Sequence, residues 1–388
     1  MRALVPSRIR NIELPPFDPL NLRAAELRAA GHRVISLGQA LPFFPPPPSA
    51  LDAARAGLEN GQVHTYSTDP GLPSLRAALT ERLASTAGID AAPDDVIITA
   101  GGNHAFALAA TTVIDPGSEV LLPAPYFTNH DMMIRALGAT PIEVPVADRE
   151  AFAVGWPDLE PHLTRATRAV VLCNPSNPTG APLDAAEGAR IVGECADRGI
   201  FVISDETYLH FVYDGQHWSA AAAPDWRRTV ILVGTFSKSF GMMGWRVGYM
   251  IADASICAEA IKVQDAMIIC APVISQMAAE GAVRHSWSYP TSFHPQLLER
   301  RQALIDGVRS IPRVRWTPTG GAFFGFVRVD GCTDSNALAQ TLLDEAHVVT
   351  IPGAAFGRSG EGHLRLSYGS ASVDDVREAT ARMDRYFR

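Results

Sequence analysis

The chain has 388 residues, of which 47% are hydrophobic and 19% charged, so it can bury a large core in two domains or in one domain with a satellite. Its net charge of −8 argues against nucleic acid as the main partner, because phosphate binding favours a basic surface. No run approaches the ~20 apolar residues that cross a bilayer, and residues 1–15 carry too many arginines for a signal peptide. We therefore expect a cytoplasmic protein that binds neither nucleic acid nor membrane.

The cysteines form no pattern that predicts a disulfide framework or a metal site. They are odd in number and scattered, and they include no C-x-x-C pair. We expect reduced, buried thiols and no bound metal. The five positions are Cys173, Cys195, Cys257, Cys270 and Cys332.

The N-terminal part predicts a loop, a short amphipathic helix and then the stretch VISLGQALPFFPPPP. Its four successive prolines, Pro45 to Pro48, must be extended, so they suit a crossing between domains. The stretch SALDAARAGLENG then predicts a helix, and YSTDPGLPSLRAALTERLAS predicts a turn that leads into an amphipathic helix.

The segment DDVIITAGGNHAFALAATTVI predicts a strand, a glycine turn and a helix. The adjacent glycines, Gly101 and Gly102, let the backbone pass close to a ligand. The following helix presents free N–H groups and the positive end of its dipole to an anion. The pattern has the form of a phosphate-binding turn, although two glycines before a helix are weak support on their own.

Three further predicted strands end in residues suited to a ligand. The string PAPYF places Phe127 just after one strand, and the string CNPSNPTG places Asn174 and Asn177 after the next. Asparagines beside prolines are by themselves ordinary turn formers. The string FVISDETY ends a buried strand at Asp205, where open α/β sheets bind ligands, although a helix N-cap would also explain this acid.

The most informative stretch is VILVGTFSKSFGMMGWRVGYMIA, in which two apolar, strand-like runs flank a polar loop that carries Lys238. Lysine occurs elsewhere only at position 262. Burial lowers the pKa of a lysine, and an unprotonated amine can form a Schiff base, which arginine cannot. Thr235, Ser237 and Arg246 would suit a phosphate group. The stretch therefore indicates a lysine joined to a phosphorylated carbonyl cofactor.

The C-terminal third predicts a strand with a glycine entry in TPTGGAFFGFVRVDG and a final amphipathic helix in VDDVREATARMDRYF. Between them, the alternation in HLRLSY places Arg365 on the opposite side of a strand from Leu364 and Leu366. The fork of an arginine side chain suits a bidentate contact with a carboxylate. The alternative for Arg365 is a surface salt bridge.

The string TFSKSFGMMGWRVGY resembles the pyridoxal-phosphate lysine motif of the class I/II aminotransferases, S-x-S-K-x-x-x-x-x-G-x-R-x-G. Other motifs follow in family order over nearly the whole chain. The resemblance implies an α/β fold, the fold type I of pyridoxal-phosphate-dependent transferases, with a mostly parallel seven-stranded sheet in a large domain. It places that domain at residues 48–285 and a smaller α/β domain at residues 1–47 and 286–388.

The resemblance also implies roles around the pyridine ring of the cofactor, pyridoxal 5′-phosphate. Lys238 would hold the cofactor and move a proton, and Asp205 would keep the ring nitrogen protonated. Tyr208, in the string SDETY, would contact the ring oxygen. Phe127 would stack on the ring where many relatives carry tryptophan. Asn177 would hydrogen-bond the ring oxygen and help to hold the substrate carboxylate.

The remaining implied roles concern the α-carboxylate of the substrate and the phosphate of the cofactor. Arg365 would grip the α-carboxylate of the substrate, and Gly38 would approach it in a loop that resembles L-G-x-G-x-P, with Ala40 in place of the second glycine. Tyr66 would reach the phosphate of the neighbouring subunit, which implies a homodimer with shared active sites. The phosphate of the same subunit would be bound by Gly101, Gly102, Asn103, Thr235, Ser237 and Arg246.

The implied activity is transfer of an amino group from an L-amino acid to a 2-oxo acid by ping-pong transamination. Some aspartate-specific relatives carry a lysine directly after the two glycines, where this chain has Asn103. The string AMIICAPVIS, near the position of a distal arginine in other dicarboxylate enzymes, contains no base. We therefore expect a neutral or aromatic donor, although Arg8 and Arg10 could supply charge to an aspartate aminotransferase.

Three other activities would use the same motifs or the same cofactor. A C–S β-lyase shares the first proton abstraction but eliminates a β-substituent. An oxidase or a cyclase of the same fold would consume oxygen or form a ring. A cofactor-binding effector domain without turnover is disfavoured, because Lys238, Asp205 and Arg365 are all present and no DNA-binding module is attached.

Overall fold

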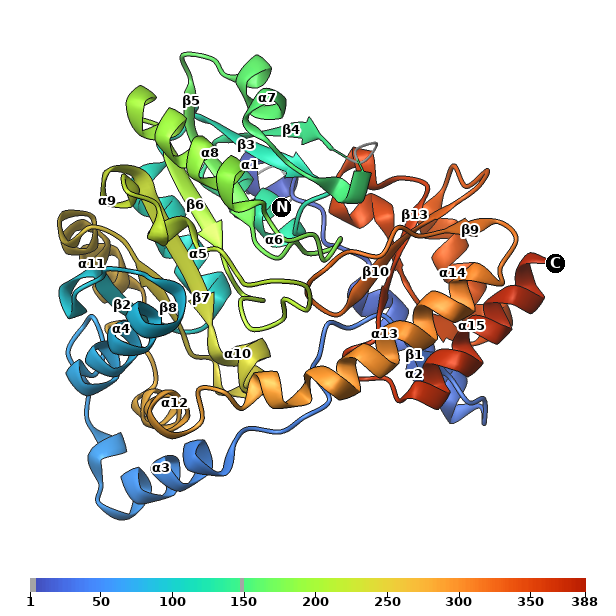
Figure 1. Ribbon diagram of the computed structural model, residues 1–388, viewed down its shortest axis with the longest axis horizontal. Helices are drawn as coiled ribbons and strands as arrows, with labels where there is room; N and C mark the ends of the chain where they lie inside the picture. Colours follow the sequence, from blue (N-terminus) through green and yellow to red (C-terminus); the bar gives the residue numbers. More distant parts are fainter. Residues whose placement is uncertain (1–4, 147–149) are drawn as a thin grey trace.

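The computed structural model describes residues 5–146 and 150–388, and Figure 1 shows how they are arranged around one large sheet. Within the described residues this sheet has seven strands, and only its pairs β2·β8 and β7·β8 are antiparallel. The mostly parallel sheet predicted from the sequence is therefore confirmed. In spatial order the strands are β2 (Val96–Thr99), β8 (Gly248–Ile251), β7 (Val230–Thr235), β6 (Phe201–Asp205), β5 (Thr167–Cys173), β3 (Glu119–Ala124) and β4 (Thr140–Pro145).

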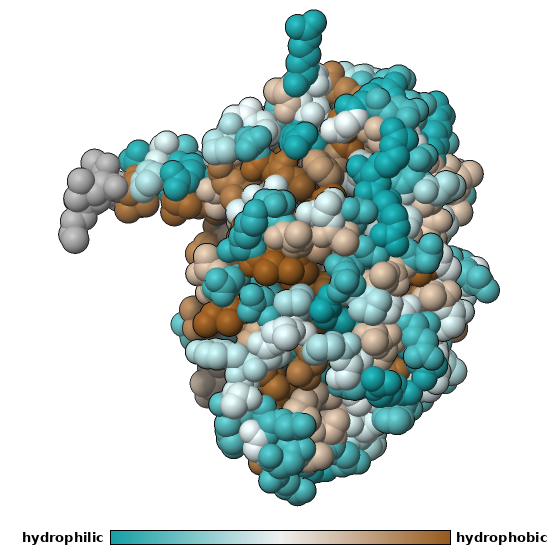
Figure 2. Space-filling model, turned by 90° about the vertical axis from the view of Figure 1, so that its left-hand side faces the viewer, coloured by the Kyte–Doolittle hydropathy of each residue, from teal (hydrophilic) through white to brown (hydrophobic). Residues whose placement is uncertain are grey.

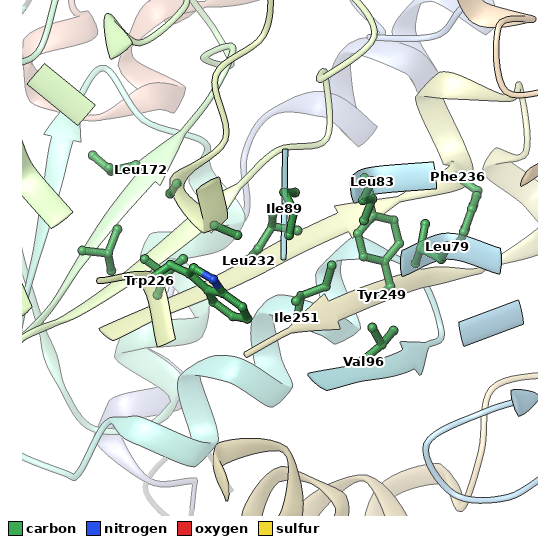
Figure 3. Packing of buried hydrophobic residues seen from close by; sticks show 14 of the residues in the cluster. Leu79, Leu83, Ile89, Val96, Leu172, Trp226, Leu232, Phe236, Tyr249 and Ile251 are labelled. Carbon is green, nitrogen blue, oxygen red and sulfur yellow. The ribbon is translucent and has the colours of Figure 1, made fainter. Parts of the chain in front are cut away.

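The central strands are continuous apolar runs because helices cover both faces of the sheet. Every residue of β7 is buried. Successive side chains of a strand point to opposite faces, so Leu232 packs in one hydrophobic cluster and Val233 in another. Figure 3 shows the first cluster, in which Tyr249 and Ile251 of β8 lie with Leu79 from the helix that covers them.

The helices divide between the two faces according to the cluster that their apolar residues join. One face is covered by α5 (Gly102–Val113), α6 (Thr128–Ala136) and α11 (Ala254–Ile268). The other face is covered by α3 (Pro48–Glu59), α4 (Pro73–Ala87), α7 (Trp156–Leu159), α8 (Ala185–Arg198), α9 (Trp226–Thr229) and α12 (Val273–His285). The short helix α1 (Ser7–Arg10) lies against α6.

Local sequence signals account for where these helices begin and end. Helix α4 begins at Pro73, whose fixed φ suits the first turn, and it ends before Gly88, which has a φ of 66°. The side chain of Asp184 caps α8 by accepting hydrogen bonds from the first backbone N–H groups, and Gly199 ends the helix in the same left-handed conformation. The helix predicted after the turn in YSTDPGLPSLRAALTERLAS, which is α4, is therefore confirmed.

A second group of elements packs beside the large sheet. A four-stranded sheet has the order β12 (Ile351–Pro352), β13 (His363–Ser367), β10 (Phe324–Val329) and β9 (Val314–Arg315), and a parallel pair joins β1 (Ile35–Ser36) to β11 (Val348–Val349). The helices of this group are α2 (Phe17–Ala29), α13 (His294–Arg309), α14 (Ser335–Ala346) and α15 (Val373–Phe387).

The pairing of β1 with β11 brings the N-terminal segment to the C-terminal third, and Figure 1 shows the blue β1 and α2 beside the orange and red helices. One hydrophobic cluster includes residues from both segments, such as Leu37 and Leu342. The prolines at positions 45–48 then lead the chain to α3, which packs against α12. These contacts agree with a smaller domain built from both ends, whose limits at residues 47 and 286 stay a prediction.

The parallel strands place one edge of the large sheet at the centre of the molecule. Strand β4 lies outside β3, whereas β5 returns to the other side of β3, so the order of the chain reverses between β3 and β5. Ligands of open α/β sheets bind at the carboxyl ends of strands at such a reversal. The segments that follow β3, β5, β6 and β7 are among those that the sequence marked for a ligand.

All five cysteines are free thiols, as predicted. Cys195, Cys257 and Cys270 are buried, whereas Cys173 and Cys332 are only half-buried. Over the ranges described, no helix is long and apolar enough to cross a membrane. In the same ranges, no group of three or more histidine, cysteine, aspartate or glutamate side chains could hold a metal ion.

Candidate active site

A cavity of about 420 Å³ opens at the carboxyl edge of the large sheet, and residues of the second group of elements line its other side. Most of the predicted site residues line it together. They are Gly102, Asn103, Phe127, Asn177, Asp205, Tyr208, Thr235, Ser237, Lys238, Arg246 and Arg365.

Lys238 lies on a one-turn helix, α10 (Phe236–Ser239), which directly follows β7. The sequence predicted a loop here, but the Thr235 side chain accepts a hydrogen bond from the Ser237 N–H and starts a helical turn. The Lys238 Nζ donates to the carbonyl of Ala40 at 2.7 Å. Burial, with the positive charges of Arg365 and Arg246, lowers the pKa of Lys238 to about 8. The amine is thus close to its neutral, nucleophilic form near neutral pH.

In the cofactor-free protein, we expect the reaction of Lys238 with an aldehyde to rise about tenfold per pH unit up to pH ~8 and then to level off. The Arg365→Met variant should shift this midpoint to higher pH, because one positive charge near the amine is removed. A titration of the isotope-labelled amine in a Lys262→Arg background, which leaves one lysine, measures both values. A midpoint near the ordinary 10.5 would contradict the predicted burial effect.

The same pKa has a defined effect on stability. Between pH ~8 and 10.5 the unfolded chain binds a proton at this lysine that the folded chain has released. The free energy of unfolding therefore rises with pH across this window. Below pH ~8 the folded protein carries the full energetic cost of a charged amine in a buried position.

Asp205 ends β6 and is buried with two hydrogen-bond partners. Its Oδ2 lies 3.0 Å from His130 Nε2, and its Oδ1 accepts the Thr207 N–H at 3.0 Å. Burial alone would raise the pKa of Asp205, but the hydrogen bonds from His130 and Thr207 outweigh it and hold the pKa below its usual value. The carboxylate is therefore anionic in the cavity, beside a histidine ring that packs at a tilt against Phe106 with the ring centres 4.2 Å apart.

Helix α5 points its N-terminus at the part of the cavity where Arg246 lies. Gly101 precedes the helix with a φ of 88°, and a Cβ there would lie 2.4 Å from the Arg246 guanidinium. The guanidinium therefore covers the glycine turn closely. Arg246 also donates to Ser237 Oγ at 3.5 Å, and it forms no ion pair with any described carboxylate. A helix N-terminus, two hydroxyls and a guanidinium without a described carboxylate partner form a suitable site for a phosphate.

Arg365 is a buried cation without a carboxylate partner among the described residues. It is 3% exposed, and no carboxylate in the described ranges pairs with it. It donates to Asn177 Oδ1 at 2.9 Å and to the Gly38 carbonyl at 2.6 Å, whereas its Nε is buried without a partner. Burial lowers its pKa to about 10. A buried, partly unsatisfied guanidinium is prepared for an anionic ligand.

Aromatic rings surround this arginine and separate it from water. Its guanidinium carbon lies 5.0 Å from the ring centre of Phe356, 5.2 Å from Phe324 and 5.7 Å from Phe17. Such rings hold a cation in place and lower the local polarity, which strengthens its attraction for a carboxylate.

Phe127 and Tyr208 occupy the remaining walls. Phe127 caps the N-terminus of α6, and its ring meets the edge of His130 with the ring centres 5.3 Å apart. Tyr208 is buried, and burial raises the pKa of its phenol, so the hydroxyl is protonated and can donate. Both side chains line the same cavity as Asp205.

Three predicted residues do not line the cavity. Gly101 and Gly38 lie just behind it, where they contact Arg246 and Arg365 as described above. Tyr66 is 76% exposed and lies outside the cavity. The two N-terminal arginines considered as a source of charge, Arg8 and Arg10, are also absent from its walls, and Arg8 donates to the Ala136 carbonyl at the end of α6.

The sequence did not single out several residues in or beside the cavity. His130 contacts Asp205 but does not itself line the cavity. It follows Phe127 by one helical turn, but a histidine in a helix carries no signal of a contact with Asp205. Other missed residues line the cavity mainly from the N-terminal loop and from α2. They are Phe17, Asp18, Asn21, Gln39, Ala40, Leu41, Cys173, Thr207 and Met243.

The residues present fit pyridoxal 5′-phosphate. A lysine of lowered pKa, an anionic buried aspartate and a phosphate site lie around one cavity, and the glycine turn leaves no room for a side chain beside Arg246. The fold and the cavity define a pyridoxal-phosphate-dependent enzyme of fold type I.

Residues 32–383 match the family described as aminotransferase class I and II, and the chain belongs to this family. It is 34% identical over 357 residues to an aspartate aminotransferase of Pyrococcus horikoshii, which covers 91% of this chain and 90% of that protein. It is 32% identical to aromatic-amino-acid aminotransferase 2 of Thermococcus litoralis, with 92% of each chain covered. Among solved structures, a mutant of Thermus thermophilus aspartate aminotransferase superposes with a TM-score of 0.92 at 28% identity, with 98% and 99% covered. The chain is therefore a pyridoxal-phosphate-dependent transaminase.

Proposed function

We propose that this transaminase moves the amino group of a neutral or aromatic L-amino acid to a 2-oxo acid. The observation that carries the proposal is the set of charges around the cavity. Among the described residues that line it, the cations are Lys238, Arg246 and Arg365, and each has a role that leaves it unavailable to a second substrate carboxylate. The acid Asp18 also lines the cavity and would repel such a group.

The cofactor would be held by groups that already lie in position. When bound, pyridoxal 5′-phosphate supplies a carbonyl carbon that can join an amine and a protonated ring that withdraws electrons. Arg246, Ser237, Thr235 and the N-terminus of α5 would bind the phosphate. Asp205 would keep a proton on the ring nitrogen, and it would stay anionic because His130 and Thr207 donate to it.

The substrate would be oriented by its α-carboxylate. Arg365 would bind this group, and Asn177 would fix the guanidinium through the hydrogen bond that it already accepts. The Lys238 amine, neutral in a large fraction of molecules near pH 8, would remove the proton from the substrate Cα and return it at the cofactor carbon. Tyr208 and Asn177 would donate to the ring oxygen, and Phe127 would lie on the ring face.

A plate of single L-amino acids, mixed with the purified enzyme without an acceptor, tests the donor class. We expect neutral and aromatic amino acids to replace the absorption band of the lysine-bound cofactor by that of its aminated form, and aspartate to do so much more slowly. A faster reaction with aspartate would show that a dicarboxylate is preferred. Pyruvate and ammonia from a cysteine conjugate, with the first band retained, would instead show β-elimination.

The proposed enzyme is a homodimer with shared active sites. Tyr66 is strongly exposed, and the neighbouring surface carries the apolar side chains of Leu58, Met267 and Ile268, which are 51%, 51% and 36% exposed. Figure 2 views the side that carries α4 and α11 in Figure 1, and hydrophobic patches lie between polar residues on it. A partner subunit would cover such a surface and bring Tyr66 to its cofactor phosphate. We also propose a cytoplasmic location and the domain limits given above.

A further inference from the structure

Two exposed loops lie next to each other at the surface assigned to the partner subunit. The Tyr66 loop (residues 66–72) connects the 3-10 turn after α3 to α4. The 267–271 loop comprises the last two residues of α11 and the first three residues of its connection to α12. Their exposed side chains include Tyr66, Met267 and Ile268. The two loops come from distant parts of the sequence, so tertiary contacts have to set their relative position.

The side chain of Gln276, on α12, contacts both loops from below. Its Nε2 donates to Ser67 Oγ at 3.0 Å and to the Ala271 carbonyl at 2.8 Å, and its Oε1 accepts the Leu72 N–H at 2.7 Å. The side chain is fully buried, at 0% exposure. One amide therefore joins the first part of the Tyr66 loop, its last residue and the end of the 267–271 loop, and it uses both of its donors and its acceptor.

The Tyr66 loop is held close to this amide. A Cβ on Gly71, which has a φ of 100°, would lie 2.6 Å from Ile98 and 2.9 Å from Gln276 Oε1. A second buried glutamine, Gln264 of α11, donates to the carbonyls of Asp69 and Ile98. The backbone of this loop is thus fixed by side chains of α11 and α12, although Tyr66 itself points away from the core.

The backbone of the 267–271 loop is strained at Ile269. Ile269 has a φ of 63° and a ψ of −71°, and the Cys270 N–H donates to the Ile268 carbonyl at 2.7 Å. These values describe a γ-turn of the rare, strained hand, which is unusual for a β-branched residue. Such a turn persists only where its surroundings hold it, and the hydrogen bond from Gln276 to Ala271 lies two residues further on.

We propose that Gln276 is a positioning residue for the shared active site. It holds the Tyr66 loop against the 267–271 loop, and so it sets where Tyr66 meets the cofactor phosphate of the partner subunit. This inference rests on the proposed dimer. A leucine or methionine would fill the same volume, but it would provide no directional link between two loops, and it would leave the Leu72 N–H and the Ala271 carbonyl without this partner.

The affinity for two forms of the cofactor tests the proposal. In full-length Gln276→Met, we expect the dissociation constant of pyridoxal 5′-phosphate to rise about 10-fold, because a charge-assisted hydrogen bond from Tyr66 is lost. The affinity for pyridoxal, which lacks the phosphate, should stay unchanged. Tyr66→Phe should behave in the same way, and the double variant should bind no more weakly than Tyr66→Phe alone.

If Gln276→Met folds poorly, two substitutions of Ser67 provide a milder test with its own control. Ser67→Ala removes one hydrogen bond of the Gln276 amide in a surface loop, whereas Ser67→Thr keeps the hydroxyl. We expect a weaker loss of affinity for the phosphorylated cofactor in the first variant and wild-type affinity in the second. Thr380→Val controls for loss of a buried hydrogen bond elsewhere, because the Thr380 hydroxyl bonds only within α15.

The outcomes separate this inference from the proposed dimer. Normal phosphate affinity in Tyr66→Phe would overturn the role of Tyr66, and the inference with it. An effect of Tyr66→Phe without an effect of Gln276→Met and Ser67→Ala would overturn the inference alone. If Gln276→Met weakened the binding of pyridoxal 5′-phosphate and of pyridoxal equally, the effect would reflect general destabilisation. The same conclusion would follow if Thr380→Val lost as much affinity as Gln276→Met. Either result would also overturn the inference.

Discussion

Replacing Lys238 with arginine is expected to lower kcat/KM for transamination by at least about 10⁴-fold, since the general base and the covalent link are both lost. Arginine keeps the positive charge and much of the length, but its pKa lies too high for it to become a neutral amine. The visible band of the lysine-bound cofactor should be absent from the purified variant. Steady-state kinetics and the absorbance spectrum measure the two effects.

Lys262 provides the matched control, because it is the other lysine of the chain and pairs with Glu259 on an exposed face of α11. We expect Lys262→Arg to retain activity within about twofold. If Lys238→Arg kept both the band and the activity, the assignment of Lys238 would be wrong.

Replacing Arg365 with methionine is expected to lower kcat/KM for an amino acid by about 10²- to 10³-fold, mainly through a higher KM. The guanidinium has no carboxylate partner among the described residues, so the substrate carboxylate would be its first. An amine without a carboxylate cannot use this contact. The preference for an amino acid over the corresponding amine should therefore fall by a similar factor, and parallel kinetics with both compounds measure it.

An exposed arginine on α15 serves as the control for this change. Arg377→Met removes a guanidinium whose charge is paired at 3.6 Å with Asp374 at the surface, so KM should not change. A uniform loss of activity toward the amino acid and the amine in Arg365→Met would contradict a specific contact with the carboxylate.

The two largest predicted effects concern two buried basic residues whose charge responds differently to burial. Lys238 is useful because burial and two nearby arginines make its charged form costly. Arg365 is useful because it stays charged in spite of its burial, among three aromatic rings. A pKa lowered to about 8 changes the state of the lysine near neutral pH, whereas a pKa lowered to about 10 leaves the arginine charged there.

The identity of the central residues could be read from the sequence because each lies at the end of a strand that its own apolar run predicts. Asp205 ends β6, Lys238 lies one turn after β7, and Asn177 follows β5. Parallel strands bring such ends to one edge of a sheet whatever the order of the strands. A local pattern was therefore sufficient to place these residues near one another.

The partners of these residues could not be read in the same way. His130 and Asp205 are separated by 75 positions, and Lys238 and Ala40 by 198. Hydrophobic periodicity predicts which face of an element is buried, but it contains no information about which distant element covers that face. The same reason explains why the contribution of α2, which supplies Phe17 and Asp18 to the cavity, was missed.

By itself, the sequence determined the strand ends, the lysine, the aspartate and the arginine on which the proposed chemistry depends, because short-range pattern and residue type are enough for these. Only the tertiary structure decided the pKa of Lys238, the aromatic surroundings of Arg365 and the link that Gln276 makes to Ser67 from 209 positions away. These properties depend on burial and on contacts between distant segments. Both arise only when the chain has packed into one structure.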